Sequence, residues 1–99
     1  MNNKTGVGII TCNRPDYLKG LLNSLVPCDY SIDELVVVND GEPITDLELF
    51  KGSLLQNKTN LGVAKSKNKA LKHLAKVGCD YFFLIEDDML IKEPTVFSQ

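Results

Sequence analysis

Short apolar runs alternate with amphipathic stretches along this chain of 99 residues. Residues 6–11 and 34–38 are rich in valine and isoleucine, which is typical of strands buried on both faces of a parallel sheet. Residues 53–56 form a shorter candidate strand, and residues 80–85 form one that is aromatic and apolar at its centre. The pattern therefore predicts four strands.

Two stretches between these strands have the apolar spacing of amphipathic helices. A helix should begin near Pro15, which the first turn of a helix tolerates, and Pro27 should end it. Its apolar face consists of Leu18, Leu21, Leu22 and Leu25. A second helix is expected over residues 62–76, with Asn60 as its cap and Gly78 after its last turn.

The second predicted helix should pack on the sheet through a face of small and aliphatic residues. These are Ala64, Ala70, Leu71 and Leu74. Residues 44–50 could add a short third helix. Strands that alternate with helices form right-handed βαβ units and a mostly parallel sheet. The predicted fold class is therefore α/β, a Rossmann-like sheet with flanking helices, and residues 1–99 are expected to form one domain.

Composition and charge exclude several classes of protein. The chain is 43% hydrophobic and 24% charged, as ordinary globular proteins are, and its net charge of −2 gives no general attraction to nucleic acid or to anionic membranes. No apolar run approaches the ~20 residues of a membrane span, and no signal peptide is visible. Cys12, Cys28 and Cys79 fit neither a zinc site nor a disulfide framework, so three reduced thiols and a cytoplasmic location are expected.

Polar residues gather directly after three of the predicted strands, at residues 11–14, 39–42 and 86–88. The carboxyl ends of parallel strands meet at one edge of the sheet, and open α/β sheets bind their ligands outside that edge. The three clusters are far apart in the sequence, but the predicted topology brings them together. The sequence therefore predicts a binding site at this edge.

Three consecutive acids, Glu86, Asp87 and Asp88, end the last predicted strand. Their charges repel one another next to an apolar strand, and a divalent cation would relieve that repulsion. Carboxylate oxygens suit Mg²⁺ or Mn²⁺, which can also bridge the phosphates of a nucleotide. A solvated acidic loop that caps a following helix explains the same residues equally well.

The other two clusters also allow two interpretations each. Asp40 could accept hydrogen bonds from a base or a ribose hydroxyl, or it could support a tight turn before Gly41. Thr11, Asn13 and Arg14 could cap the first helix, and they could also contact a nucleotide. Capping alone is sufficient to explain Thr11 and Asn13.

The second predicted helix is rich in lysine. Lys65 and Lys67 lie near its N-terminus, where backbone N–H groups and basic side chains would both favour a diphosphate. A solvated helix face accounts for most of these lysines without any ligand.

Four segments, taken in order, resemble motifs of the inverting GT-A glycosyltransferases known as family 2. Residues 9–18 resemble the opening strand and helix of the family, and residues 34–41 resemble its strand that ends in Asp-Asp-Gly-Ser. Residues 60–71 resemble its Asn-x-Gly…Ala-Arg-Asn helix, and residues 82–88 resemble the strand that delivers its DxD metal motif. The resemblance covers nearly the whole chain.

The resemblance implies that the chain binds a nucleotide-diphosphate sugar, linked to UDP or GDP, with Mn²⁺ or Mg²⁺, for inverting transfer to an acceptor hydroxyl. The nucleotide-binding residues that it implies are Thr11, Asn13, Arg14, Asp40, Lys67, Glu86 and Asp87. Among them Asp40 would bind the base, and Lys67 would lie near the pyrophosphate or ribose. Asp88 would be the chief metal ligand, with Glu86 as a second one.

Several residues depart from the family pattern. Cys12 replaces an aromatic residue, Asn39 replaces the first acid of the second motif, and Glu86 replaces the first Asp of DxD. Lys67 stands where the family has arginine, and a lysine cannot bind a phosphate with two parallel hydrogen bonds as arginine does. Because of these departures, the resemblance does not identify the nucleotide. It still implies that the site binds a metal ion and a diphosphate.

Length is the largest departure, because family members continue with an acceptor-binding half that carries the catalytic base. We therefore expect the chain to be the donor-binding part of an enzyme, without an identifiable base. Either it is a fragment, or its partner half comes from another chain. The exposed edge of a truncated sheet makes a homo-oligomer plausible.

The sequence also has to be compared with other functions. A non-catalytic module that binds a nucleotide or a protein is the main alternative. A dinucleotide-dependent oxidoreductase or a sugar nucleotidyltransferase would need a glycine-rich turn after the first strand, and residues 11–15 contain no glycine.

Overall fold

The structure, a computed structural model, describes residues 3–26, 32–44 and 52–88. Its strands are β1 (Thr5–Thr11), β2 (Glu34–Asn39), β3 (Ser53–Gln56) and β4 (Tyr81–Glu86), and its helices are α1 (Pro15–Leu25) and α2 (Val63–Lys76). All strand pairs are parallel, in the order β3-β2-β1-β4. The predicted α/β class and parallel sheet are confirmed. The short helix expected over residues 44–50 lies, apart from Ile44, outside the described residues.

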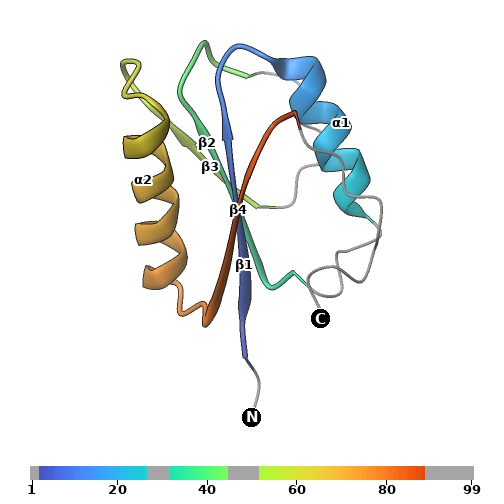
Figure 1. The fold of residues 1–99 in the computed structure, drawn as a ribbon, viewed down its shortest axis with the longest axis vertical. Coiled ribbons are helices and arrows are strands. Elements are labelled where there is room, and N and C mark those ends of the chain that lie inside the picture. Colours follow the sequence, from blue (N-terminus) through green and yellow to red (C-terminus); the bar gives the residue numbers. More distant parts are fainter. Residues whose placement is uncertain (1–2, 27–31, 45–51, 89–99) are drawn as a thin grey trace.

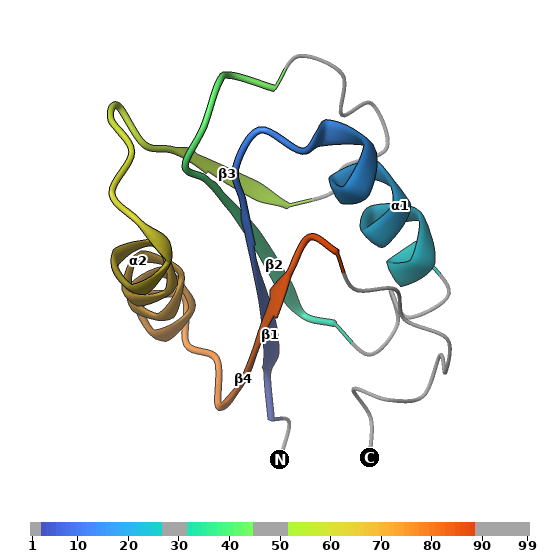
Figure 2. The same cartoon turned by 45° about the horizontal axis from the view of Figure 1, so that its top comes forward.

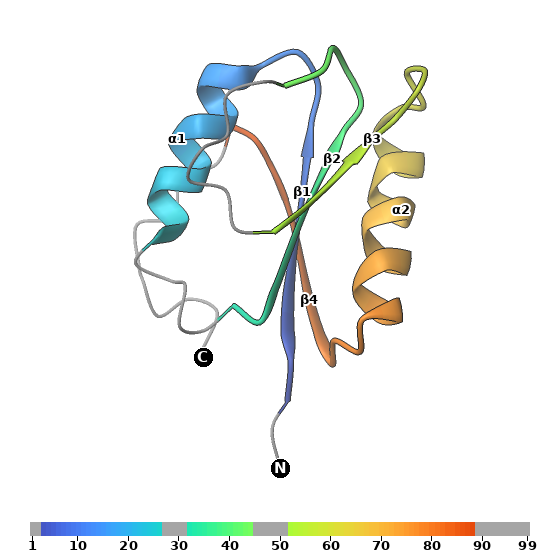
Figure 3. The ribbon, with the colours of Figure 1, turned by 180° about the vertical axis from the view of Figure 1, so that it is seen from behind.

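The two helices cover opposite faces of the sheet (Figure 1), as the view from behind also shows (Figure 3). Alternate residues of β1 point to opposite faces, as in any strand. Val7 and Ile9 belong to the core cluster that contains the buried leucines of α1, whereas Ile10 packs in the cluster of α2. The whole of β1 is buried, which explains its continuous apolar pattern.

Glycines on one face of β1 let α2 lie close to the sheet. A Cβ atom added at Gly8 would lie 3.1 Å from the Cβ of Ala70, so a side chain there would press against the helix. The helix buries Ser66, Ala70 and Leu74. The predicted inward face was therefore wrong at Ala64, which is exposed, because the stripe in contact with the sheet recurs every four residues from Ser66.

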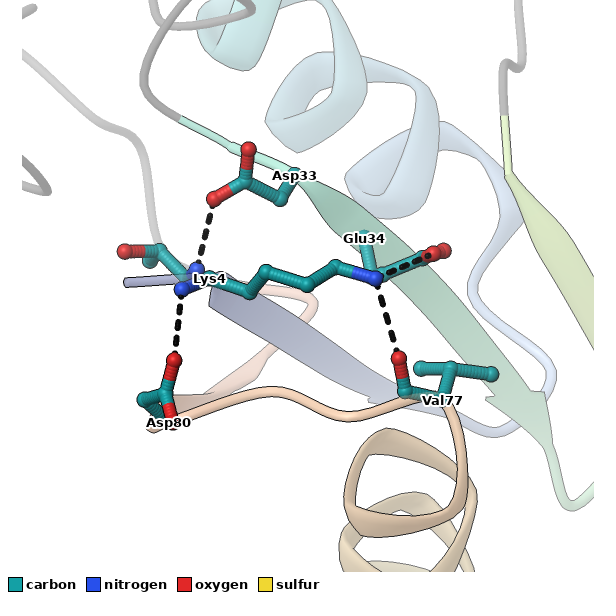
Figure 4. A network of polar contacts seen from close by, with 6 residues as sticks. Lys4, Asp33, Glu34, Val77 and Asp80 are labelled. Carbon is teal, nitrogen blue, oxygen red and sulfur yellow. Dashed lines mark hydrogen bonds and ion pairs between the residues drawn. The ribbon is translucent and has the colours of Figure 1, made fainter. Parts of the chain in front are cut away.

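A polar network ties the amino ends of three strands together (Figure 4). The Nζ atom of Lys4 donates a hydrogen bond of 2.9 Å to the carbonyl oxygen of Val77 and lies 3.6 Å from a carboxylate oxygen of Glu34. The backbone N–H of Lys4 donates to Asp80, and that of Thr5 donates to a carboxylate oxygen of Asp33. These contacts stabilise the sheet at the edge opposite the predicted site.

Neither described helix is long and apolar enough to cross a membrane. Cys12 and Cys79 are free thiols, and Cys28 lies outside the described residues.

Candidate functional site at the carboxyl edge of the sheet

The segments that follow β1, β2 and β4 meet at one edge of the sheet, as predicted (Figure 2). Thr11 is paired with Asn39 in the sheet, and Ile10 is paired with Glu86. The connection after β1 therefore lies between the connection after β2 and the end of β4. Hydrogen bonds link the first of these segments to each of the other two.

A cleft of about 410 Å³ opens at this edge on the side of α1. Its lining residues are Thr11, Asn13, Arg14, Pro15, Lys19, Glu42, Pro43 and Ile44. Three predicted nucleotide-binding residues, Thr11, Asn13 and Arg14, thus share one cavity of a size suited to a small ligand. Asp40, Lys67 and the acidic triplet do not line it.

The rim of this cleft is held by Asn13, which adopts a left-handed backbone conformation with φ of 56°. Its side-chain oxygen accepts a hydrogen bond of 2.7 Å from the backbone N–H of Glu42. Gly41 lies so close that an added Cβ would be 2.7 Å from the backbone nitrogen of Asn13. Asn13 therefore joins the connection after β1 to the connection after β2.

The predicted capping of α1 by Thr11 or Asn13 is wrong, because no side chain among the described residues caps this helix. Arg14 occupies the cap position, and Pro15 follows it in the first turn. The side chains of Thr11 and Asn13 are instead bonded to Asp87 and to the backbone of Glu42.

Asp87 is buried and contacts Thr11, the last residue of β1, and Arg14, which follows that strand. Its Oδ2 atom accepts a hydrogen bond of 2.7 Å from the hydroxyl of Thr11. Its Oδ1 atom lies 2.6 Å from Nη2 of Arg14, in an ion pair. Arg14 also lies over the ring of Tyr17, at 5.4 Å from the centroid.

Glu86 and Asp88 are exposed on either side of Asp87. Neither side chain is bonded or ion-paired with another described residue. The described residues contain no group of three His, Cys, Asp or Glu side chains that could hold a metal ion. The two acids nevertheless fit Mg²⁺ or Mn²⁺, because such ions are commonly held by one or two carboxylates and by the phosphates of the substrate.

Asp40 points to the other face of the sheet, toward the start of α2. Its Oδ1 atom accepts a hydrogen bond of 2.7 Å from the backbone N–H of Leu61, and its Oδ2 atom accepts one of 2.9 Å from that of Gly62. The first turn of α2 contains no acidic residue, so the carboxylate of Asp40 supplies the negative charge that a helix N-terminus favours. The backbone N–H groups there are thus partly occupied by the protein itself.

The environment of Asp40 keeps it ionised. Burial by itself would raise the pKa of this carboxyl group, whose ordinary value is 3.8. The hydrogen bonds from Leu61, Asn57 and Gly62 outweigh burial, and the pKa is lowered. The positive charge of Lys69 adds to this effect.

Asn60 does not cap α2, contrary to the prediction. Gly62 occupies the cap position with φ of 90°, and no described side chain caps the helix in the usual way. The side chain of Asn60 instead donates a hydrogen bond of 3.1 Å to the carbonyl oxygen of Asp40 and contacts the sulfur of Cys12 at 3.6 Å. It therefore connects the turn before α2 to the segment after β1.

Asn57 and Lys69 were missed by sequence reasoning. Asn57 donates to Asp40 and to Ser66, and its own side-chain oxygen accepts a hydrogen bond of 2.6 Å from Nζ of Lys69. Asn57 directly follows β3, so the rule that singled out the polar residues after three other strands would have found it. Lys67, by contrast, contacts no polar side chain among the described residues.

One family model and several solved structures match this chain. The model of the glycosyl transferase family 2 matches residues 6–96. A search of curated proteins gives no match. A solved structure of S. aureus TarS 1–349 is similar over 96% of this chain and 30% of its own, with a TM-score of 0.72 and 29% identity.

Two further TarS structures are similar over 86% of this chain, each with a TM-score of 0.65. One is a crystal structure titled S. aureus TarS, matched over 16% of its chain at 29% identity. The other is TarS 1–349 in complex with UDP, matched over 27% of its chain at 30% identity. The chain therefore has the GT-A fold expected from its motifs, and it spans less than a third of each of these three TarS chains.

Proposed function

Because the chain belongs to glycosyl transferase family 2, we propose that it is the donor-binding part of a glycosyltransferase and binds a UDP-linked sugar. The match over residues 6–96 supports the glycosyltransferase assignment. A TarS structure that is 30% identical contains UDP, which favours UDP over GDP among the two nucleotides expected from the sequence.

The observation that carries this proposal is the position of Arg14 between the cleft and the acidic end of β4. Arg14 lines the cleft, and its guanidinium group is ion-paired with Asp87, whose neighbours Glu86 and Asp88 are exposed. A cation suited to phosphate thus lies beside carboxylates suited to a divalent metal. A nucleotide diphosphate is the ligand that would use both.

The cleft residues have complementary roles in this proposal. Thr11 and Asn13 line the part that would hold the nucleoside, and Arg14 would contact the diphosphate. Asp88 and Glu86 would hold Mn²⁺ or Mg²⁺, which would neutralise charge on the diphosphate leaving group.

Asp40 and Lys67 remain predicted nucleotide contacts. The carboxylate of Asp40 accepts three hydrogen bonds, which leaves one of its roughly four acceptor positions for a base.

Transfer with inversion to an acceptor hydroxyl completes the proposal. It needs a general base within hydrogen-bond reach of the attacking oxygen. The chain covers only 16–30% of the three TarS chains. We therefore propose the acceptor site and the general base for the whole protein and assign neither to this chain. No described residue is assigned as that base.

Calorimetric titration of UDP, GDP and their sugar conjugates, with Mn²⁺ and with EDTA, tests the proposal. We expect UDP to bind in the presence of Mn²⁺, and Asp88→Ala to weaken that binding by at least tenfold. Asp16→Ala is the matched control, because Asp16 is an exposed acid of the first turn of α1 outside the cleft lining. Equal UDP affinity with EDTA and in Asp88→Ala would exclude the metal site.

Self-association is a separate proposal. Strand β4 lies at the edge of the described sheet, and Tyr81 and Phe82 on it are exposed. Gel filtration at several concentrations distinguishes a homo-oligomer from a monomer.

A further inference from the structure

We propose that Asp87 is a positioning residue, which orients Arg14 at the rim of the cleft and does not itself bind the donor or the metal. Of the three consecutive acids, only the exposed Glu86 and Asp88 would then remain available to a metal ion. This inference rests on the proposed function, because it takes Arg14 as the group that meets the diphosphate.

The contacts of Asp87 leave it no access to a ligand. Its side chain has 0% exposure, whereas that of Arg14 is 47% exposed. One carboxylate oxygen is bonded to Thr11, and the other lies against Arg14. Asp87 could reach a metal ion only by leaving this buried position.

The geometry of the sheet explains why the middle acid turns inward. Ile85 packs in the core cluster on the α1 side, and Asp87, two residues later, continues on that side. Pairing of Ile10 with Glu86 then brings Thr11 next to Asp87. Because α1 begins just after Arg14, the guanidinium group is on the same side.

Charge provides an independent reason for the pairing. A buried carboxylate without a cationic partner is unfavourable, and three adjacent acids repel one another. The ion pair with Arg14 relieves both effects, which leaves two acids instead of three to repel each other. Arg14 therefore neutralises the charge of Asp87, and a metal ion would have to neutralise only those of Glu86 and Asp88.

Arg14 keeps donors for a ligand while it is held in place. A guanidinium group has five N–H donors, and the contact with Asp87 involves Nη2. The ring of Tyr17 lies 5.4 Å from the guanidinium carbon. A side chain restricted by two neighbours loses less entropy when it binds an anion, which increases affinity.

A double-mutant cycle in UDP affinity with Mn²⁺ tests this inference. We expect Asp87→Asn to weaken UDP binding about tenfold in the wild-type background, and by less than about twofold in the Arg14→Gln background. Asp16→Asn, which removes a nearby exposed acid, should leave UDP affinity unchanged. Equal losses in both backgrounds would mean that Asp87 contacts the donor or the metal directly. Tighter binding by Asp87→Asn would mean that it acts only as a repelling charge.

A second measurement needs neither a variant nor UDP. The Nη–H resonance of Arg14, from the group in contact with Asp87, is followed by NMR while Mg²⁺ is added to the wild-type chain. It should keep its position, because Asp87 stays with Arg14; a shift to the position of free arginine would show that Asp87 leaves it for the metal. Absence of UDP binding would refute the proposed function, whereas this resonance would still decide the role of Asp87.

Discussion

Asn57 donates a hydrogen bond of 2.7 Å to Oδ1 of Asp40 and so joins the end of β3 to the end of β2. The same carboxylate accepts hydrogen bonds from the backbone N–H groups of Leu61 and Gly62 at the start of α2. One side chain therefore fixes the turn between β3 and α2 from a neighbouring strand.

Asp40→Asn should lower the free energy of unfolding by about 1–3 kcal/mol, because it removes the charge and turns an amide toward backbone donors. Urea denaturation compares the variant with the wild type. A loss below about 0.5 kcal/mol would show that the carboxylate contributes little to the position of α2.

Stability should also depend on pH through Asp40. Its pKa is lowered in the folded state, from an ordinary value of 3.8. The stabilisation is therefore complete above that value and is lost as the pH falls through the lower, folded pKa. Below pH 3.8 the wild type should lose more free energy of unfolding than Asp40→Asn does. Parallel pH profiles for the two proteins would contradict this expectation.

Lys69 and Lys67 form a matched pair on α2. Lys69→Met should cost about 1–2 kcal/mol, because the buried oxygen of Asn57 loses its donor. Lys67→Met should change stability by less than about 0.5 kcal/mol, since Lys67 has no polar partner in the described part of the chain. Thermal and urea unfolding of both variants measure the difference, and equal losses would argue against the Lys69–Asn57 contact.

Gly41→Ala should reduce UDP affinity as well as stability. The new Cβ would lie 2.7 Å from the backbone nitrogen of Asn13, so the rim of the cleft must move. Gly78→Ala is the control. Gly78 follows the C-terminus of α2, far from the cleft, has φ of 87°, and has no atom within 4 Å of an added Cβ. Both variants should lose about 1–2 kcal/mol of stability. Only Gly41→Ala should bind UDP more weakly, and unchanged affinity would show that this rim does not touch the nucleotide.

Local pattern was sufficient for the elements. The apolar run that became β1 and the leucine spacing of α1 predicted both within one residue of their observed starts, because burial on a strand or helix repeats with a fixed period. The convergence of Thr11, Arg14 and Asp87 at one edge followed from the parallel topology alone.

Pairwise contacts were not predictable in the same way. The sequence offered Thr11 and Asn13 as helix caps and Lys67 as the important lysine, whereas the structure pairs Thr11 with Asp87 and Asn57 with Lys69. Lys67 and Lys69 are two positions apart on one helix, which turns their side chains in different directions.

By itself, the sequence determined the strands, the helices, the parallel sheet and the edge at which polar residues gather, because periodic burial is encoded by neighbouring residues. Only the tertiary structure decided that Asp87 turns inward to Arg14 and that Asp40 reaches the start of α2. Thr11 and Asp87 are 76 residues apart in the chain, and Asp40 and Asn57 are 17 apart. Which hydrogen-bond partners meet across such separations depends on strand register and on how closely the glycines of β1 let α2 approach.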